Sequence, residues 1–183
     1  MNEATVLERT IRIRPISARE AVERSSVLAD ILVDCVVGGA AVSFLAPLAR
    51  DKAEAFWRRV AEGVARGERV LIVAEERPSG TVIGTAQLAL EQPENQPHRA
   101  DVQKVLVRRD ARRRGIGAAL MRSVEDAARA AGKTLLALDT TNGSDAERLY
   151  ERLGWVRLGV MPGHALLPDG RPSDTTYFYK HLV

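Results

Sequence analysis

The chain has 183 residues, of which 45% are hydrophobic and 28% charged, a composition typical of a globular domain with a core of its own. No apolar run reaches the ~20 residues that a bilayer-spanning helix needs, and the N-terminus has no signal-peptide core. The single cysteine, Cys35, excludes an internal disulfide and a cysteine metal cluster. From the length, the composition and these exclusions together, we expect one cytoplasmic domain over residues 1–183. A net charge of +3 is too small to require a nucleic-acid partner but is compatible with an anionic small ligand.

The first half of the chain predicts a strand, two helices and a hairpin. Alternating isoleucines indicate a short first strand, and Ser17 with Glu20 forms a capping box for the helix that follows. Two apolar runs flank the turn "EERPSG" and predict an antiparallel pair. The predicted elements are a strand over 10–15, helices over 18–36 and 51–66, and strands over 70–74 and 81–90.

The second half alternates strands with helices, which is typical of an α/β layout on one mixed sheet. Gly132 stands where a C-terminal helix cap belongs, and Ser144 with Glu147 forms a second capping box. The last strand is a candidate for pairing across a homodimer. The predicted elements are strands over 100–107, 134–140, 155–161 and 175–182, and helices over 116–131 and 144–153.

The segment "VLVRRDARRRGIGAALM", residues 105–121, joins a strand to a helix through five arginines and two glycines. A helix N-terminus has unpaired N–H groups and favours negative charge, and Gly115 and Gly117 would let a phosphate approach the backbone. The segment therefore predicts a diphosphate site. A plain strand-to-helix loop and a nucleic-acid patch are the alternatives, and little other basic clustering supports the second. The segment matches neither G-x-G-x-x-G nor the P-loop.

The stretch "RRRGIG", residues 112–117, matches the [QR]-x-x-G-x-[GA] signature of the GCN5-related N-acetyltransferase (GNAT) family, and it follows a strand as that family requires. "AERLYERLGW" resembles the second family motif, with Tyr150 and the closing Gly154-Trp155. The resemblance extends from about Ile11 to Leu182. The stretches "DCVVGGAAVSF", "RADVQKVLV", "LDT" and "PDGR" are most similar to the tabtoxin-resistance branch. The resemblance implies a mixed, mostly antiparallel sheet of about seven strands, flanked by about four helices and splayed between the fourth and fifth strands.

The resemblance implies acetyl-CoA as the acetyl donor and no metal. Backbone amides of residues 112–118 would hold the pyrophosphate, and the strand end would pair with the pantetheine arm. The asparagine that the family often carries falls on Gly143 here, so either the loop shifts to let Asn142 serve or that contact is missing. The predicted cofactor-binding residues are Leu106, Val107, Arg112, Arg113, Arg114, Gly115, Ile116, Gly117, Ala118 and Asn142.

The predicted chemistry is direct attack of a neutral amine on the thioester, which a base and an acid assist. Tyr150 resembles the family's tyrosine near the CoA sulfur and is the candidate acid; the alternative is a core aromatic residue. Asp101 and Asp139 are the candidate bases or amine-holding anions, with an exposed strand-end charge and a turn residue as their alternatives. The three histidines are scattered and predict no metal site.

The function that the resemblance implies is transfer of acetyl to the amine of a small molecule, with antimicrobial compounds and toxins among the acceptors. Two alternatives stay open. One is acetylation of a protein or peptide N-terminus, and the other is a non-catalytic acyl-CoA-binding module. Neither a nucleic acid nor a membrane is expected as a partner.

Overall fold

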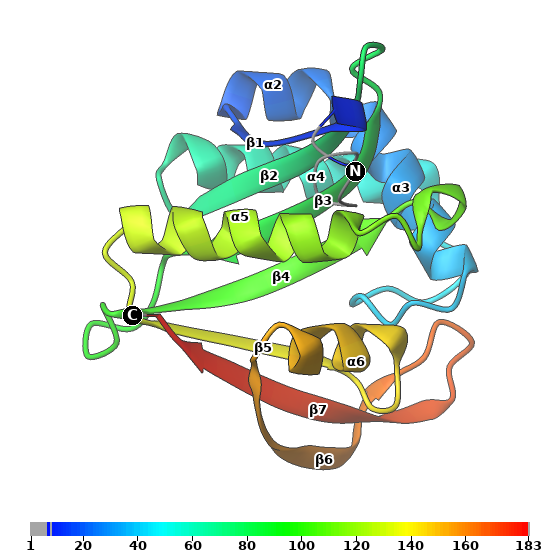
Figure 1. Cartoon of the computed structure of the whole chain (residues 1–183). Coiled ribbons are helices and arrows are strands. Elements are labelled where there is room, and N and C mark those ends of the chain that lie inside the picture. The colour runs from blue at the N-terminus through cyan, green and yellow to red at the C-terminus, as the bar shows by residue number, and fades with distance from the viewer. Residues whose placement is uncertain (1–6, 8, 183) are drawn as a thin grey trace.

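In the computed structural model, which describes residue 7 and residues 9–182, the chain forms one sheet with helices on both faces (Figure 1). The strand order is β1-β2-β3-β4-β5-β7-β6. Neighbouring strands are antiparallel except β4 and β5, which are parallel. The predicted α/β fold with a mixed, mostly antiparallel sheet is therefore confirmed.

The elements lie close to their predicted positions. The strands are β1 (Ile11–Ile16), β2 (Arg69–Glu76), β3 (Val82–Ala89), β4 (Arg99–Val107), β5 (Leu135–Thr141), β6 (Val156–Leu166) and β7 (Pro172–His181). The α-helices are α2 (Ala18–Glu23), α3 (Ser25–Val37), α4 (Arg50–Ala65), α5 (Ile116–Ala130) and α6 (Asp145–Arg152), and a 3₁₀ turn covers Arg109–Ala111. Among these described helices, none is both long and apolar enough to cross a bilayer.

Two hydrophobic cores lie on opposite faces of the sheet, one beneath α5 and α6 and one beneath α2, α3 and α4 (Figure 1). Strand β2 supplies both cores, because successive side chains of a strand point to opposite faces. Ile72 packs on the α5 side, while Leu71 and Val73 pack on the α4 side with Trp57. Burial on both faces explains why β2 is almost continuously apolar.

The predicted helix over 18–36 is divided at Arg24 into α2 and α3, so residues 11–182 contain five α-helices instead of about four. The Arg24 guanidinium lies 3.0 Å from the carboxylate of Glu75, a buried residue of β2. Arg14 binds the same carboxylate at 2.9 Å. A buried carboxylate requires cationic partners, and the break in the helix is where one of them is supplied.

The last strand does not have a free edge. Strand β7 lies between β5 and β6 and pairs with both, so the predicted pairing of residues 175–182 across a homodimer is wrong. The edge strand on this side of the sheet is β6, which extends to Leu166 instead of ending at Met161. Leu158 on β6 is 73% exposed, the highest value among the large hydrophobic side chains described.

Strands β4 and β5 separate after a short paired stretch. Residues 99–101 pair with residues 135–137, and beyond that point each strand keeps only its other neighbour. The predicted splay between the fourth and fifth strands is therefore confirmed. The separation leaves the β5-facing edge of residues 102–107 unpaired along an opening in the sheet.

A bulge interrupts β4 at the splay. Lys104 and Val105 lie opposite the single residue Ala86, and Lys104 has φ 50°. Because the extra residue shifts the alternation, Val105 packs in the core on the α5 side and does not share a face with Gln103. In a strand without a bulge, Gln103 and Val105 would share one face.

Candidate functional site

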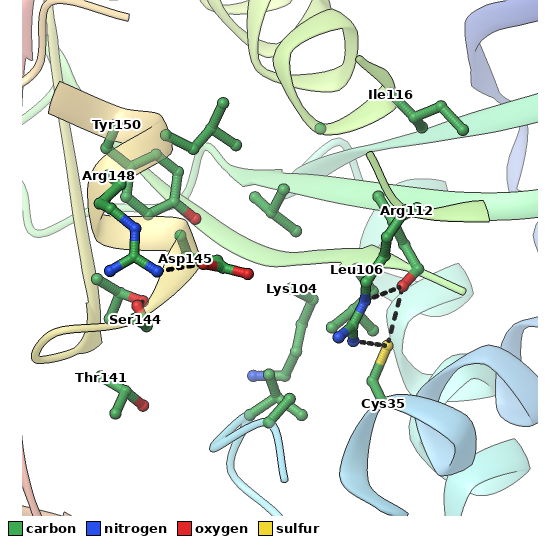
Figure 2. A pocket seen from close by; sticks show the side chains of 18 of the residues that line it. Cys35, Lys104, Leu106, Arg112, Ile116, Thr141, Ser144, Asp145, Arg148 and Tyr150 are labelled. Atoms are coloured by element: carbon green, nitrogen blue, oxygen red, sulfur yellow. Dashed lines mark hydrogen bonds and ion pairs between the residues drawn. The ribbon is translucent and has the colours of Figure 1, made fainter. Parts of the chain in front are cut away.

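A cavity of about 860 Å³ opens where β4 and β5 separate, which is a volume typical of small-ligand pockets (Figure 2). Its wall combines the splayed strand ends, the loop after α3, the start of α5 and helix α6. The main lining segments are residues 38–43, 102–107, 111–113, 115–118, 139–141, 144–146 and 148–150. The cavity thus joins segments that the sequence analysis treated as separate motifs.

Helix α5 begins at this cavity. Its N-cap, Gly115, has φ 75°, a left-handed conformation that glycine adopts without the steric cost of a Cβ. A Cβ at Gly117 would approach the Leu149 side chain to 3.1 Å, so a small residue lets α5 lie close to α6. Among the described residues, no hydrogen bond reaches the backbone N–H groups of residues 113–118. Free amides at the positive end of a helix fit a diphosphate.

The three arginines before α5 have different surroundings. Arg112 and Arg113 line the cavity, and the Arg112 Nε donates to the Val107 carbonyl at 3.2 Å. Arg114 does not line the cavity and lies 2.8 Å from the Glu76 carboxylate. The geometry therefore favours Arg112 and Arg113 as the cations for an anionic ligand.

Helix α6 adds two arginines that were not predicted as site residues. Arg148 and Arg152 both line the cavity, and their spacing of four residues places them on one helix face. Arg148 forms an ion pair with Asp145, which also lies 3.3 Å from Arg113. These contacts, first with Arg148 and then with Arg113, lower the pKa of Asp145. The i, i+4 arginine pair in "AERLYERLGW" was the signal available in the sequence.

Leu106 and Val107 form the wall at the end of β4, where the strand has no partner on the side of β5. The Val107 carbonyl accepts from Arg112 and from the Cys35 thiol, whose sulfur lies 3.6 Å away. Burial raises the pKa of Cys35, while the nearby Arg112 acts in the opposite direction. Cys35 is thus a buried, protonated thiol, consistent with a small core residue.

Tyr150 belongs both to the core and to the cavity. Its ring packs 5.9 Å from Phe178 and 6.1 Å from Trp155, measured between ring centroids. Its hydroxyl end points into the cavity, and no described residue forms a hydrogen bond with it (Figure 2). Burial, and to a lesser extent the negative charge of Asp139, raises the pKa of the phenol. The hydroxyl is therefore protonated at neutral pH.

Of the two candidate carboxylates, the structure brings Asp139 to the cavity and leaves Asp101 outside its lining. Asp139 lies two residues beyond the last β4–β5 pair and influences the pKa values of Tyr150 and Lys104. Asp101 lies near the start of β4, where Arg99 binds its carboxylate at 2.8 Å. The geometry therefore favours Asp139 as the group that faces an acceptor.

Asn142 follows β5 but is not part of the described cavity lining. Its Oδ1 accepts a hydrogen bond from the Thr176 hydroxyl at 3.0 Å. The role predicted for Asn142 stays a prediction without geometric support. The predicted capping box beside it is only half formed. The Ser144 hydroxyl accepts a hydrogen bond from the Glu147 N–H, but the Glu147 carboxylate accepts from the Gly143 N–H instead of the Ser144 N–H.

Lys104 is a cavity residue that was not predicted as a site residue. The bulge directs its side chain into the cavity, where Nζ donates to the Ser43 hydroxyl at 2.9 Å (Figure 2). Burial lowers the pKa of the ammonium, and the Asp139 carboxylate opposes this shift. A lysine inside the otherwise apolar "KVLV" run was the only signal in the sequence, and alternation alone could not show where it points.

Metal ligation was not expected from the sequence. The described residues contain no group of three or more His, Cys, Asp or Glu side chains arranged to hold a metal ion. His164 instead contacts Tyr177, with 3.0 Å between the imidazole Nε2 and the phenol oxygen.

A model of the acetyltransferase (GNAT) family matches residues 27–155, which include the splay, the α5 junction and Tyr150. The chain therefore belongs to this family. A curated relative from Azospirillum brasilense, described as an uncharacterized N-acetyltransferase in the hisH-hisA intergenic region, is 35% identical over 114 residues. That match covers 61% of this chain and 65% of the relative, so the chain matches less than two thirds of the relative's length.

Solved structures share the fold over most of the chain. The putative acetyltransferase yncA from Salmonella typhimurium, solved with its cofactor acetyl-CoA, has a TM-score of 0.77, 22% identity and 95% coverage of both chains. A phosphinothricin acetyltransferase from Sinorhizobium meliloti, in complex with acetyl-CoA, has a TM-score of 0.76, 20% identity, and coverage of 94% of this chain and 89% of its own. The closer resemblance to the tabtoxin-resistance branch stays a prediction.

Proposed function

We propose that the chain is an acetyl-CoA-dependent N-acetyltransferase that acts on the amine of a small molecule, with antimicrobial amines among the candidate acceptors. The observation that carries the proposal is the cavity at the β4–β5 splay. The free amides of the α5 N-terminus, Tyr150 and Asp139 all meet there. Family membership and the acetyl-CoA complexes of two similar folds support the same donor.

The donor would occupy the part of the cavity nearest α5. The amides of residues 113–118 would bind its pyrophosphate, and Arg112 and Arg113 would neutralise charge there. The unpaired edge at Leu106 and Val107 would hold the extended arm by backbone hydrogen bonds. An N–H at this edge would also stabilise negative charge on the thioester oxygen.

Acetyl-CoA, when bound, supplies the thioester whose carbonyl carbon the amine attacks and whose thiolate leaves. Asp139 would hold the incoming ammonium and accept its proton, because this carboxylate faces the opening of the sheet. Tyr150 would donate a proton to the leaving thiolate, since the raised pKa of its phenol leaves the hydroxyl protonated. Neither role requires a covalent enzyme intermediate.

The donor site can be tested by acetyl-CoA titration calorimetry and by release of CoA thiol in the presence of a broad amine panel. The double variant Arg112→Gln/Arg113→Gln should bind acetyl-CoA about tenfold more weakly, because two cavity cations are lost. Arg114→Gln is the matched control, since this arginine pairs with Glu76 outside the cavity.

Equal binding by the double variant and the control would contradict the proposed phosphate site. Binding of acetyl-CoA without transfer to any amine would favour a non-catalytic acyl-CoA module. A strong preference for peptide N-termini over small amines would favour the peptide acetyltransferase alternative.

A further inference from the structure

We propose that the acceptor is a zwitterion with an amine and a nearby carboxylate or similar anion, and that Lys104 binds the anionic group. The inference rests on the proposed function, because it assumes that the acetylated amine enters this cavity. It narrows the acceptor to amino-acid-like molecules and disfavours polycationic amines.

The ammonium of Lys104 has N–H donors that no described residue accepts. Its described hydrogen-bond partner is the Ser43 hydroxyl at 2.9 Å, and no described carboxylate lies within 4.0 Å of it. An ammonium carries three N–H donors, so two remain for a ligand. Lys180 and Lys133 differ from Lys104, because each of their ammonium groups binds two acceptors of the protein. Lys180 binds Glu125 at 2.7 Å and a carbonyl at 2.8 Å, and Lys133 binds two carbonyls.

The backbone on both sides of this contact is held in a costly conformation. Lys104 has φ 50° and Ser43 has φ 73°, and both residues line the cavity. Non-glycine residues enter this region at a cost and are retained there when the surrounding structure fixes them, most often at ligand sites. The Lys104 Nζ also lies 5.8 Å from the centroid of the Phe56 ring, which steadies the cation. The ammonium is therefore positioned before any ligand arrives.

Opposite charges face the same cavity without forming an ion pair. The Asp139 carboxylate acts on Lys104 by its charge but lies beyond 4.0 Å from Nζ. Arg69 is a second cation whose field reaches Lys104. A ligand with its ammonium at Asp139 and its carboxylate at Lys104 satisfies both groups. A neutral or polycationic amine leaves the half-buried lysine uncompensated, which costs binding energy.

The donor has no need of this lysine. The cations for its phosphates, Arg112 and Arg113, stand at the start of α5, beyond the end of β4. Lys104 contacts the loop after α3 and a side chain of α4 on the other face of the sheet. Lys104 is therefore assigned to the acceptor, and a contribution to acetyl-CoA binding becomes one outcome of the test.

The test compares the native chain with Lys104→Met, which keeps an unbranched apolar stem beside Phe56. Lys52→Met is the matched control, because Lys52 is an exposed lysine 5.9 Å from the neighbouring Phe44 ring and does not line the cavity. Each variant is assayed with L-amino acids, their carboxamides and their decarboxylated amines. Acetyl-CoA affinity is measured by calorimetry, and binding of amino acids to the CoA-loaded protein by ligand-observed NMR.

We expect the native chain and Lys52→Met to prefer an amino acid over its amide by roughly 10- to 100-fold in kcat/KM. In Lys104→Met this preference should fall below about threefold, with unchanged acetyl-CoA affinity. Equal use of acids and amides by the native chain would overturn the inference, as would a parallel loss of acetyl-CoA binding in Lys104→Met.

Failure of the proposed function is distinguishable from failure of the inference. If no amine is acetylated, the acetyltransferase proposal fails, and the NMR experiment still decides the role of Lys104. Binding of amino acids but not amides, lost in Lys104→Met, supports the anion site. Absence of such binding overturns it.

Discussion

Tyr150 combines a structural role with a proposed chemical role at the scale of one residue. Its ring belongs to the core on the α5 side, and its hydroxyl reaches the cavity. The sequence left a core aromatic and a proton donor as alternatives, but a buried ring with a cavity-facing hydroxyl is compatible with both. The residue is 5% exposed, and this burial moves the pKa of the phenol further above neutral pH.

Tyr150→Phe retains the ring and removes the proposed proton donor. We expect kcat to fall by about 100-fold while acetyl-CoA affinity stays unchanged, as for the loss of a general acid. Deprotonation of the phenol would remove the proposed acid. Because the pKa of Tyr150 is raised, the native chain should lose activity by this route only at a pH above ~10, the pKa of a free tyrosine. Steady-state kinetics from about pH 7 to 10 measure the fall in kcat and check that the native chain shows no loss of activity from phenol deprotonation in this range. Tyr179→Phe, outside the cavity lining, is the control, and a kcat within about threefold of native would refute the role.

The two candidate carboxylates can be separated by isosteric amides. Asp139→Asn should lower kcat/KM for the acceptor by about 10- to 100-fold, because the group that holds and deprotonates the ammonium is lost. Asp101→Asn should change it by less than about threefold, since Asp101 pairs with Arg99 away from the cavity. The measurement is acceptor-saturation kinetics at saturating acetyl-CoA. The reverse ranking would return the base to Asp101.

At the scale of the element, the junction before α5 was the most informative stretch of sequence. The spacing of its glycines and arginines predicted a helix start that accepts a diphosphate, and no described residue forms a hydrogen bond with the backbone amides at that position. The arginines of this segment have different surroundings, including the three that were predicted to bind the cofactor. Arg109 binds Asp34 at 2.7 Å, Arg114 binds Glu76, and only Arg112 and Arg113 of the group line the cavity. A linear pattern cannot show which carboxylate each guanidinium will meet.

Helix α5 offers a matched pair of glycines for testing its N-terminus. Gly115 and Gly132 have φ values of 75° and 69°, one at each end of the helix. Alanine at either position should lower the free energy of unfolding by about 1 kcal/mol, because a Cβ is disfavoured in that conformation. Only Gly115→Ala should also weaken acetyl-CoA binding. Urea denaturation and calorimetry measure the two effects, and equal acetyl-CoA affinity of both variants would argue against a ligand at the N-terminus.

Strand β4 shows where a periodic pattern fails. Its apolar residues correctly predicted a strand over 100–107, but the two-against-one bulge at Lys104 changes which face the later side chains occupy. The bulge depends on how β4 pairs with β3, and that pairing is not encoded in the alternation of β4 itself. Lys104 was therefore overlooked, although it is the residue on which the proposed acceptor class depends.

At the scale of the whole molecule, the cavity exists because one sheet is only partly closed. The parallel pair β4 and β5 is held together at one end by three residues on each strand and separates at the other. The core beneath α5 and α6 contains residues of both β4 and β5, so it joins the two parts of the sheet on that face while the gap remains open. The proposed chemistry is thus placed where the scaffold lacks backbone pairing and a ligand can supply it.

The sequence by itself determined the elements, their order and the helix start that suits a diphosphate. These features are local: apolar spacing, capping residues and glycines act within a few positions of one another. Tertiary structure alone decided that Asp139 faces the cavity and Asp101 does not, that Arg114 is turned away, and that Lys104 points inward. Those outcomes depend on strand register, a bulge and ion pairs between distant segments. The physical reason is that a side chain's partners are set by what the fold brings beside it, and the local pattern sets only the conformation of its backbone.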